Sequence, residues 1–157
     1  MRRYVLALVL AIAVISAHAE APALSQGQTL YLPVYSHLWY GDVGRKAQPA
    51  QHPLSVLVSI RNTDPRRAIR IVSARYYDTQ GKLVREYLPA PRAVPPLGTA
   101  EFYVERTDMK GGSGANFLVI WTASEPANPP MVEGLHADII GNRTLSFVTS
   151  ARAIQPE

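Results

Sequence analysis

The sequence predicts an all-β fold: a single antiparallel β-sandwich of immunoglobulin-like character, with about eight strands. Two observations predict it. Apolar and polar residues alternate over short stretches after residue 20, whereas helical periodicity is almost absent there. Most of the 13 prolines fall between these stretches, and they mark loops because proline cannot donate to a strand ladder. Short strands at regular spacing, with turn signals between them, are typical of a β-sandwich.

The first strand is expected over residues 28–40, where Pro33 indicates an edge strand or a bulge. The clearest alternation is in LSVLVSIRN (54–62), whose apolar residues share one face, as in a half-buried strand. Asp78 and Gly81 are expected to form a hairpin turn, with the glycine in the left-handed conformation. The other strands are expected at 69–77, 82–88, 99–106, 117–123, 131–140 and 144–154.

The first 19 residues have the three parts of a secretory signal peptide. Arg2 and Arg3 precede an apolar run over 5–15, and Ala17-His18-Ala19 forms an A-x-A site. The run is too short for an ordinary membrane span of about 20 residues. We therefore expect cleavage after Ala19 and a single β domain over residues 20–157. The alternative is an uncleaved anchor helix.

The composition excludes several classes of site. The chain has no cysteine, so it has no disulfides, no thiolate zinc site and no cysteine for lipid attachment or haem. A hydrophobic core must therefore hold the domain together. The formal charge of +4 becomes +2 once Arg2 and Arg3 are removed with the signal. We expect a periplasmic or secreted protein with no nucleic-acid partner, no transmembrane segment after cleavage and no cofactor.

The stretch MKGGSGANFLVIW (109–121) looks most like catalytic machinery. Its Gly111-x-Ser113-x-Ala115 pattern nearly matches the nucleophile elbow, but that elbow needs a helix after it. The residues that follow are predicted to form a central strand, so no helix dipole is available for a phosphate either. We expect a flexible or tightly turned hairpin loop, and a role for its backbone N–H groups in binding an anion stays open.

Alternation in LYLPVYSHLWYGD (30–42) places aromatic residues on one face of the first strand. They can anchor a partner or stack on sugar rings. The favoured interpretation is a second apolar layer, covered by the 41–53 loop or by cross-strand neighbours. The glycine-rich loop at 111–116 is included in the predicted binding surface as a neighbour of these aromatic residues. The predicted binding residues are Tyr31, Tyr35, His37, Trp39, Asp42, Gly112, Ser113 and Asn116.

His136 and Asp138 are expected on the same face of one strand, where a carboxylate can orient an imidazole. Ser113, His136 and Asp138 are the residue types of a catalytic triad, but nothing in the sequence indicates that they lie close together in the fold. A metal site needs at least three converging ligands, and the histidines are widely spaced. An ordinary solvated strand face is favoured over either site.

Five arginines lie close together in the sequence, in one predicted hairpin. Such a patch can recognise acidic envelope polymers, but a solvated turn whose arginines pair with nearby acids is the favoured interpretation. The residues are Arg61, Arg66, Arg67, Arg70 and Arg75.

Several of these segments, in this order, resemble a bacterial exported family catalogued as domain of unknown function 3124. The resemblance implies a single-domain envelope or secreted protein and no known activity. It is carried by LYLPVYSHLWYGD (30–42), LSVLVSIRNTDP (54–65), RYYDTQGKLVREYL (75–88), GGSGANFLVIW (111–121) and LSFVTSAR (145–152).

The sequence thus favours a non-enzymatic binding or interaction module of the cell envelope, with an envelope protein or polysaccharide as its partner. The alternative from another class is a small periplasmic hydrolase or metal-binding protein that uses His136, Asp138 and Ser113. A third is a structural subunit whose first strand pairs with another chain at a sheet edge.

Overall fold

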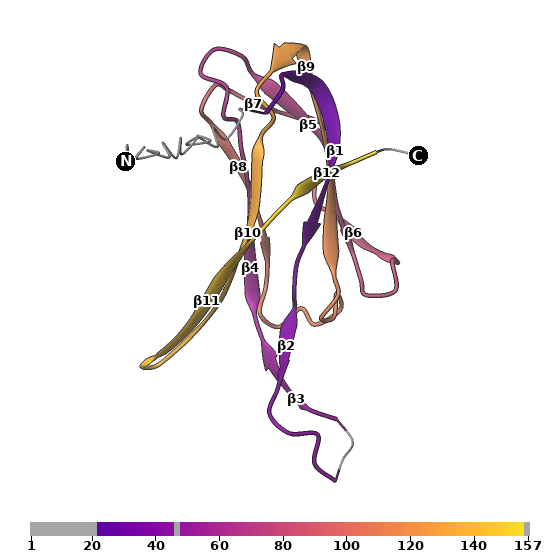
Figure 1. Ribbon diagram of the computed structural model, residues 1–157, viewed down its shortest axis with the longest axis vertical. Coiled ribbons are helices and arrows are strands. Elements are labelled where there is room, and N and C mark those ends of the chain that lie inside the picture. The colour runs from indigo at the N-terminus through magenta and orange to yellow at the C-terminus, as the bar shows by residue number, and fades with distance from the viewer. Residues whose placement is uncertain (1–21, 46–47, 156–157) are drawn as a thin grey trace, which may run out of the picture.

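A computed structural model describes residues 22–45 and 48–155, and these residues form twelve strands and no helix (Figure 1). The all-β, antiparallel prediction is confirmed. The predicted signal peptide (1–19) and its cleavage site lie outside the described residues. No helix in the described part of the chain is long and apolar enough to cross a membrane.

The strands form two larger sheets and a two-stranded ribbon. The first sheet contains β1 (Ser25–Pro33), β5 (Ile69–Tyr77), β6 (Leu83–Glu86), β7 (Arg92–Val94), β9 (Asn116–Ala127) and β12 (Arg152–Ile154), in the order β12-β1-β9-β5-β6 with β7 also on β5. The second contains β4 (Ser55–Arg61), β8 (Thr99–Val104), β10 (Met131–Ile140) and β11 (Arg143–Ser150), in the order β11-β10-β4-β8. The ribbon pairs β2 (His37–Tyr40) with β3 (Ala50–Pro53).

All eight expected strand segments are strands in the structure, but two of them are divided. The segment expected at 28–40 forms β1 and β2, and the segment at 144–154 forms β11 and β12. Two short strands, β3 and β7, were not expected. Prolines flank or end both of these segments, which therefore resemble loops in the sequence.

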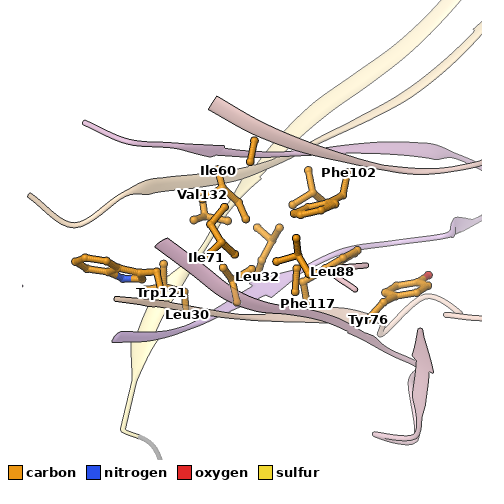
Figure 2. Packing of buried hydrophobic residues seen from close by; sticks show 14 of the residues in the cluster. Leu30, Leu32, Ile60, Ile71, Tyr76, Leu88, Phe102, Phe117, Trp121 and Val132 are labelled. Atoms are coloured by element: carbon orange, nitrogen blue, oxygen red, sulfur yellow. The ribbon is translucent and has the colours of Figure 1, made fainter. Parts of the chain in front are cut away.

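Apolar side chains from both larger sheets form one buried cluster. Figure 2 shows Ile60 and Phe102 of the second sheet facing Leu32 and Phe117 of the first. The buried residues alternate along β8, β9 and β10, as the sequence predicts; β9, for example, buries every second residue from Phe117 to Trp121. Burying each such large apolar side chain contributes about 1.5–3 kcal/mol, so this cluster supplies the cohesion that disulfides cannot.

β1 is not a free edge. β9 pairs with one side of it, and β12 pairs with the other side over Thr29–Tyr31. Pro33 is the last residue of β1, and the register shift in this pairing lies at Ser25/Gly27 instead. The edge at which a second chain was expected to pair is therefore already occupied along the middle of β1.

The β5–β6 hairpin has the predicted turn. Gly81 has a φ of 78°, which is the left-handed conformation that glycine adopts without strain. The Asp78 carboxylate accepts hydrogen bonds from the backbone N–H groups of Gln80 (2.9 Å) and Lys82 (2.8 Å).

Candidate functional site

The candidate site lies where the β2–β3 ribbon leaves the two sheets, at one end of the molecule (Figure 1). β1 ends at Pro33, and the chain bends at Ser36 before β2 begins. The bend is held by the glycine-rich loop: the N–H of Val34 donates to the carbonyl of Ala115 (2.9 Å), and that of Ser36 donates to the carbonyl of Gly112 (3.1 Å). The ribbon therefore starts from a fixed point beside this loop.

One face of the ribbon meets the glycine-rich loop. Trp39 Nε1 donates to Ser113 Oγ (3.1 Å), and the Trp39 ring lies edge-on to His37, with ring centroids 5.1 Å apart. Trp39 nevertheless keeps 44% of its surface exposed. The structure thus brings four of the predicted binding residues together: His37, Trp39, Ser113 and the adjoining Gly112.

His37 is buried, which the predicted alternation did not anticipate. The bend at Ser36 shifts the phase, so Ser36 and His37 are both buried although they are consecutive. Ser36 Oγ donates to the Gly112 carbonyl (3.1 Å) and lies 3.1 Å from His37 Nδ1. Because the hydroxyl has one hydrogen, Nδ1 is the donor of this pair and Nε2 carries the lone pair. In the described part of the chain Nε2 has no hydrogen-bond partner, and burial lowers the pKa of this imidazole.

The other face of the ribbon approaches the second sheet. His52, on β3, places Nε2 2.6 Å from Oδ2 of Asp138 on β10. Arg106 Nε lies 2.8 Å from Oδ1 of the same carboxylate and forms an ion pair with it. Oδ1 has no hydrogen-bond partner among the described residues. The Asp138 side chain is only 5% exposed. Tyr40, which is 56% exposed, lies edge-on to His52.

Tyr35 does not join the exposed aromatic residues. Its ring packs edge-on against His136 and Phe147, at centroid distances of 5.6 and 5.9 Å. Its backbone N–H donates to His136 Nε2 (3.0 Å). Tyr35 therefore ties the end of β1 to β10 and β11.

The other predicted binding residues lie apart from this cluster. Tyr31 is on the outer face of the first sheet and is 37% exposed. Asp42 is in the exposed loop after β2. Asn116 is the first residue of β9 and lies beside Pro33 and Tyr77. The aromatic residues of 30–42 do not form one continuous stripe, because the bend at 34–36 divides the predicted strand.

The Ser113–His136–Asp138 triad does not form. His136 and Asp138 do share one face of β10, as predicted. That face is buried, so the favoured interpretation of a solvated strand face is wrong for these two residues. However, His136 uses Nε2 for the Tyr35 N–H and Nδ1 for the Gly134 carbonyl (3.0 Å), so neither ring nitrogen can serve Ser113 or Asp138. The Ser113 hydroxyl accepts from Trp39 instead. Over the described ranges, 22–45 and 48–155, no three acidic or histidine side chains are grouped to hold a metal ion.

The glycine-rich loop belongs to a crossover between the two sheets, from β8 to β9, and the strand predicted after it is present. Gly112 has a φ of 78°. Thr79 holds the loop from the β5–β6 hairpin: its backbone N–H and its hydroxyl both donate to the Gly111 carbonyl (2.9 and 3.0 Å). Its Oγ1 also accepts from the Gly114 N–H (3.0 Å). The loop is therefore tightly packed, and the nucleophile elbow is excluded because β9 follows it.

Three of the five arginines in the 61–75 segment pair with acids. Arg61 contacts Glu133 (2.8 Å), Arg75 contacts Glu86 (3.8 Å), and Arg67 contacts both Asp64 and Glu125 (3.5 and 3.4 Å). This agrees with the favoured interpretation of local ion pairs. The predicted hairpin is wrong, however, because β4 and β5 lie in different sheets and the segment between them crosses from one to the other.

Sequence reasoning missed the His52–Asp138 pair and the exposure of Tyr40. The two paired residues are 86 positions apart, and His52 lies in a proline-flanked segment that was taken for a loop. The sequence offers no specific signal for this pair, because His52 lies outside every predicted strand and only Asp138 lies on one.

The comparison with protein-family models confirms the sequence resemblance. The family model described as "Protein of unknown function (DUF3124)" matches residues 27–154. No curated protein matches the chain. Among solved structures, "Crystal Structure of Thermotoga maritima 1070" is similar, with 10% sequence identity, a TM-score of 0.43 and coverage of 80% of this chain and 92% of that one. Since the family model covers nearly all of the described residues, this chain belongs to the family of proteins of unknown function DUF3124.

Proposed function

We propose that this chain is an exported, non-enzymatic interaction module of the bacterial cell envelope, and that the β2–β3 ribbon is its partner-binding surface. The observation that carries the proposal is the exposure of two aromatic side chains on a ribbon that projects from the body (Figure 1). Trp39 is 44% exposed and Tyr40 is 56% exposed. Such side chains bury large areas at little cost in conformational entropy, which makes them effective anchors for a protein or a sugar ring.

The ribbon is also well suited to hold these anchors in place. Trp39 is oriented by its hydrogen bond to Ser113, and Tyr40 by its contact with His52, which is in turn paired with Asp138. A side chain that is already ordered loses less entropy on binding. Both anchors therefore rest on contacts to the two sheets rather than on the ribbon alone.

We further propose that the two sheets form a sandwich related to the immunoglobulin fold. Two pairings support this: β4 with β8, and β5 with β9, match the B–E and C–F pairs of that fold. The strands that flank these two pairs differ from those of an immunoglobulin domain. β1 lies beside β9, and β10 lies beside β4, whereas an immunoglobulin domain has its first strand in the B sheet and its last strand in the F sheet.

The first prediction tests the ribbon by substituting its exposed aromatics. A Trp39→Ala/Tyr40→Ala variant is expected to lose most of the retention of an envelope component that the wild-type protein shows. Tyr103→Ala is the matched control, because Tyr103 is 54% exposed on the outer face of the second sheet. Tyr35 is unsuitable for substitution since it packs on His136 and Phe147.

The measurement is retention by the immobilised protein, with detergent-solubilised envelope proteins and purified envelope polysaccharide as separate arms. We expect at least a tenfold loss for the double variant, equivalent to about 1.4 kcal/mol, and none for the control. The melting temperature should fall by only a few degrees. A fall of about 10 °C or more would make these residues structural, and equal retention by all three proteins would remove the ribbon as the binding surface.

A further inference from the structure

A cavity of about 450 Å³ lies between the ribbon and the β10–β11 hairpin. Its lining is drawn from three parts of the chain: His52 on β3, Asp138 on β10, and the turn and first residues of β11 at 142–145. This volume falls within the range of small-molecule sites, about 300–1,000 Å³. The His52–Asp138 contact joins the ribbon to the second sheet at this cavity.

The carboxylate at the base of the cavity is balanced by its own chain. Asp138 is almost fully buried, with His52 Nε2 at 2.6 Å from one oxygen and Arg106 Nε at 2.8 Å from the other. A buried carboxylate held between two cationic or donor groups is well compensated. Its negative charge is therefore offset within the chain, although Oδ1 makes no hydrogen bond among the described residues.

The remaining polar groups of the cavity are rich in donors. Arg143 has a guanidinium with five N–H groups, Asn142 has an amide, and Thr144 has a hydroxyl. Within the described residues, none of these three side chains is hydrogen-bonded or ion-paired to another protein group, unlike the arginines at 61, 67 and 75. A free guanidinium beside an amide and a hydroxyl matches the acceptor oxygens of an oxyanion.

We propose that this cavity binds a small molecule bearing a carboxylate or a phosphate, with Arg143 as the principal anion-binding residue. Asn142 and Thr144 supply further hydrogen bonds, and Leu145 gives the body of the ligand an apolar contact. The cavity volume suits a body of monosaccharide size. The site is separate from the Trp39 anchor and does not depend on the ribbon's proposed role.

The second prediction is tested by NMR titration of the ¹⁵N-labelled protein with D-glucuronate and with glucose 6-phosphate, and with glucose as the neutral probe. We expect shifts concentrated at the amides of 142–145 and at His52, with a Kd in the millimolar range or tighter, for at least one charged probe. The probe that binds more tightly identifies the oxyanion as carboxylate or phosphate. Glucose should produce no such shifts.

Two variants and one control establish which residues bind. Arg143→Gln should weaken binding at least tenfold, and Thr144→Val should weaken it by a smaller factor. Arg70→Gln is the matched control, because Arg70 is an exposed arginine of the first sheet with no ion pair among the described residues, and it should bind as wild type does. Tyr103→Ala should also bind normally, because Tyr103 is on β8, at the opposite edge of the second sheet from β11.

Three results would overturn the proposal. They are the absence of shifts at 142–145 with either charged probe up to about 10 mM, equal shifts with glucose, and binding by Arg143→Gln that matches wild type while its melting temperature shows that it is folded.

Discussion

At the residue scale, His136 is a buried polar residue whose ring nitrogens are both engaged by neighbouring groups. It is fully buried; its ring stacks on Phe147 with centroids 4.4 Å apart, its Nε2 accepts from the Tyr35 N–H, and its Nδ1 donates to the Gly134 carbonyl. Burial lowers the pKa of this imidazole, because the charged form is poorly solvated there. Protonation would also place a hydrogen on Nε2 directly opposite the N–H of Tyr35.

The third prediction follows from this geometry. A histidine whose pKa is lower in the folded state than its unfolded value of 6.5 stabilises the fold above pH 6.5, and this contribution is lost as the pH falls below 6.5. Wild type should therefore melt at a lower temperature at pH 5 than at pH 8. His136→Gln should be less stable at pH 8, by about 1–3 kcal/mol, and less dependent on pH.

His37 serves as the control, since burial lowers its pKa as well but its Nε2 has no hydrogen-bond partner among the described residues. His37→Gln should leave most of the pH dependence that comes from His136. If His136→Gln and wild type lose the same stability between pH 8 and pH 5, then His136 does not carry this dependence.

At the scale of elements, the glycine-rich loop is the point where three parts of the chain are joined. Its carbonyls accept hydrogen bonds from Thr79 of the β5–β6 hairpin and from Ser36 at the start of the ribbon. Gly111 is required by close approach: a Cβ there would overlap the Tyr76 hydroxyl. Because the start of the ribbon and Trp39 are hydrogen-bonded to this loop, displacement of the loop should also displace Trp39.

The fourth prediction is that Gly111→Ala destabilises the protein by about 1–3 kcal/mol, as overpacking does in a well-packed core. Ser113→Ala, two residues away, adds no bulk and should cost less than about 1 kcal/mol. The measurement is the free energy of unfolding in urea, repeated in a Tyr76→Phe background. The cost of Gly111→Ala should fall only in part in that background, because the Tyr76 ring and the Ala115 Cβ would also lie too close to the added Cβ. A cost of Gly111→Ala no larger than that of Ser113→Ala would contradict the prediction.

At the scale of the whole molecule, the chain depends on one buried cluster shared by the two larger sheets (Figure 2). There is no cysteine to reinforce it. The proposal of export adds a further requirement, since an exported domain without disulfides must be stable on packing alone.

The fifth prediction concerns the N-terminus. If the first 19 residues are a cleaved signal peptide, protein recovered from the periplasmic or secreted fraction should begin at Glu20, as measured by intact mass and N-terminal sequencing. Ala19→Arg should block processing and leave a heavier precursor in the membrane fraction. Recovery of the full-length chain from wild-type cells would instead indicate an uncleaved anchor.

Much of the fold could be predicted from local pattern. Alternation from Leu54 to Ile60 identifies the buried face of β4 correctly, and Asp78 and Gly81 identify the β5–β6 turn. These features depend on neighbouring residues alone: side chains alternate between the faces of a strand, and a tight turn needs a residue that tolerates positive φ. The sequence by itself therefore determined the strand segments, most of the core and the family.

Only the tertiary structure decided how these elements meet. The bend at Ser36 buries His37 and divides the predicted aromatic stripe, and the pairing of His52 with Asp138 joins the ribbon to the second sheet at the cavity that Arg143 lines. Alternation specifies the two faces of a strand, but it does not say which strand lies beside it or where a break shifts the phase. Those choices depend on contacts between distant segments, and the candidate sites of this protein are built from such contacts.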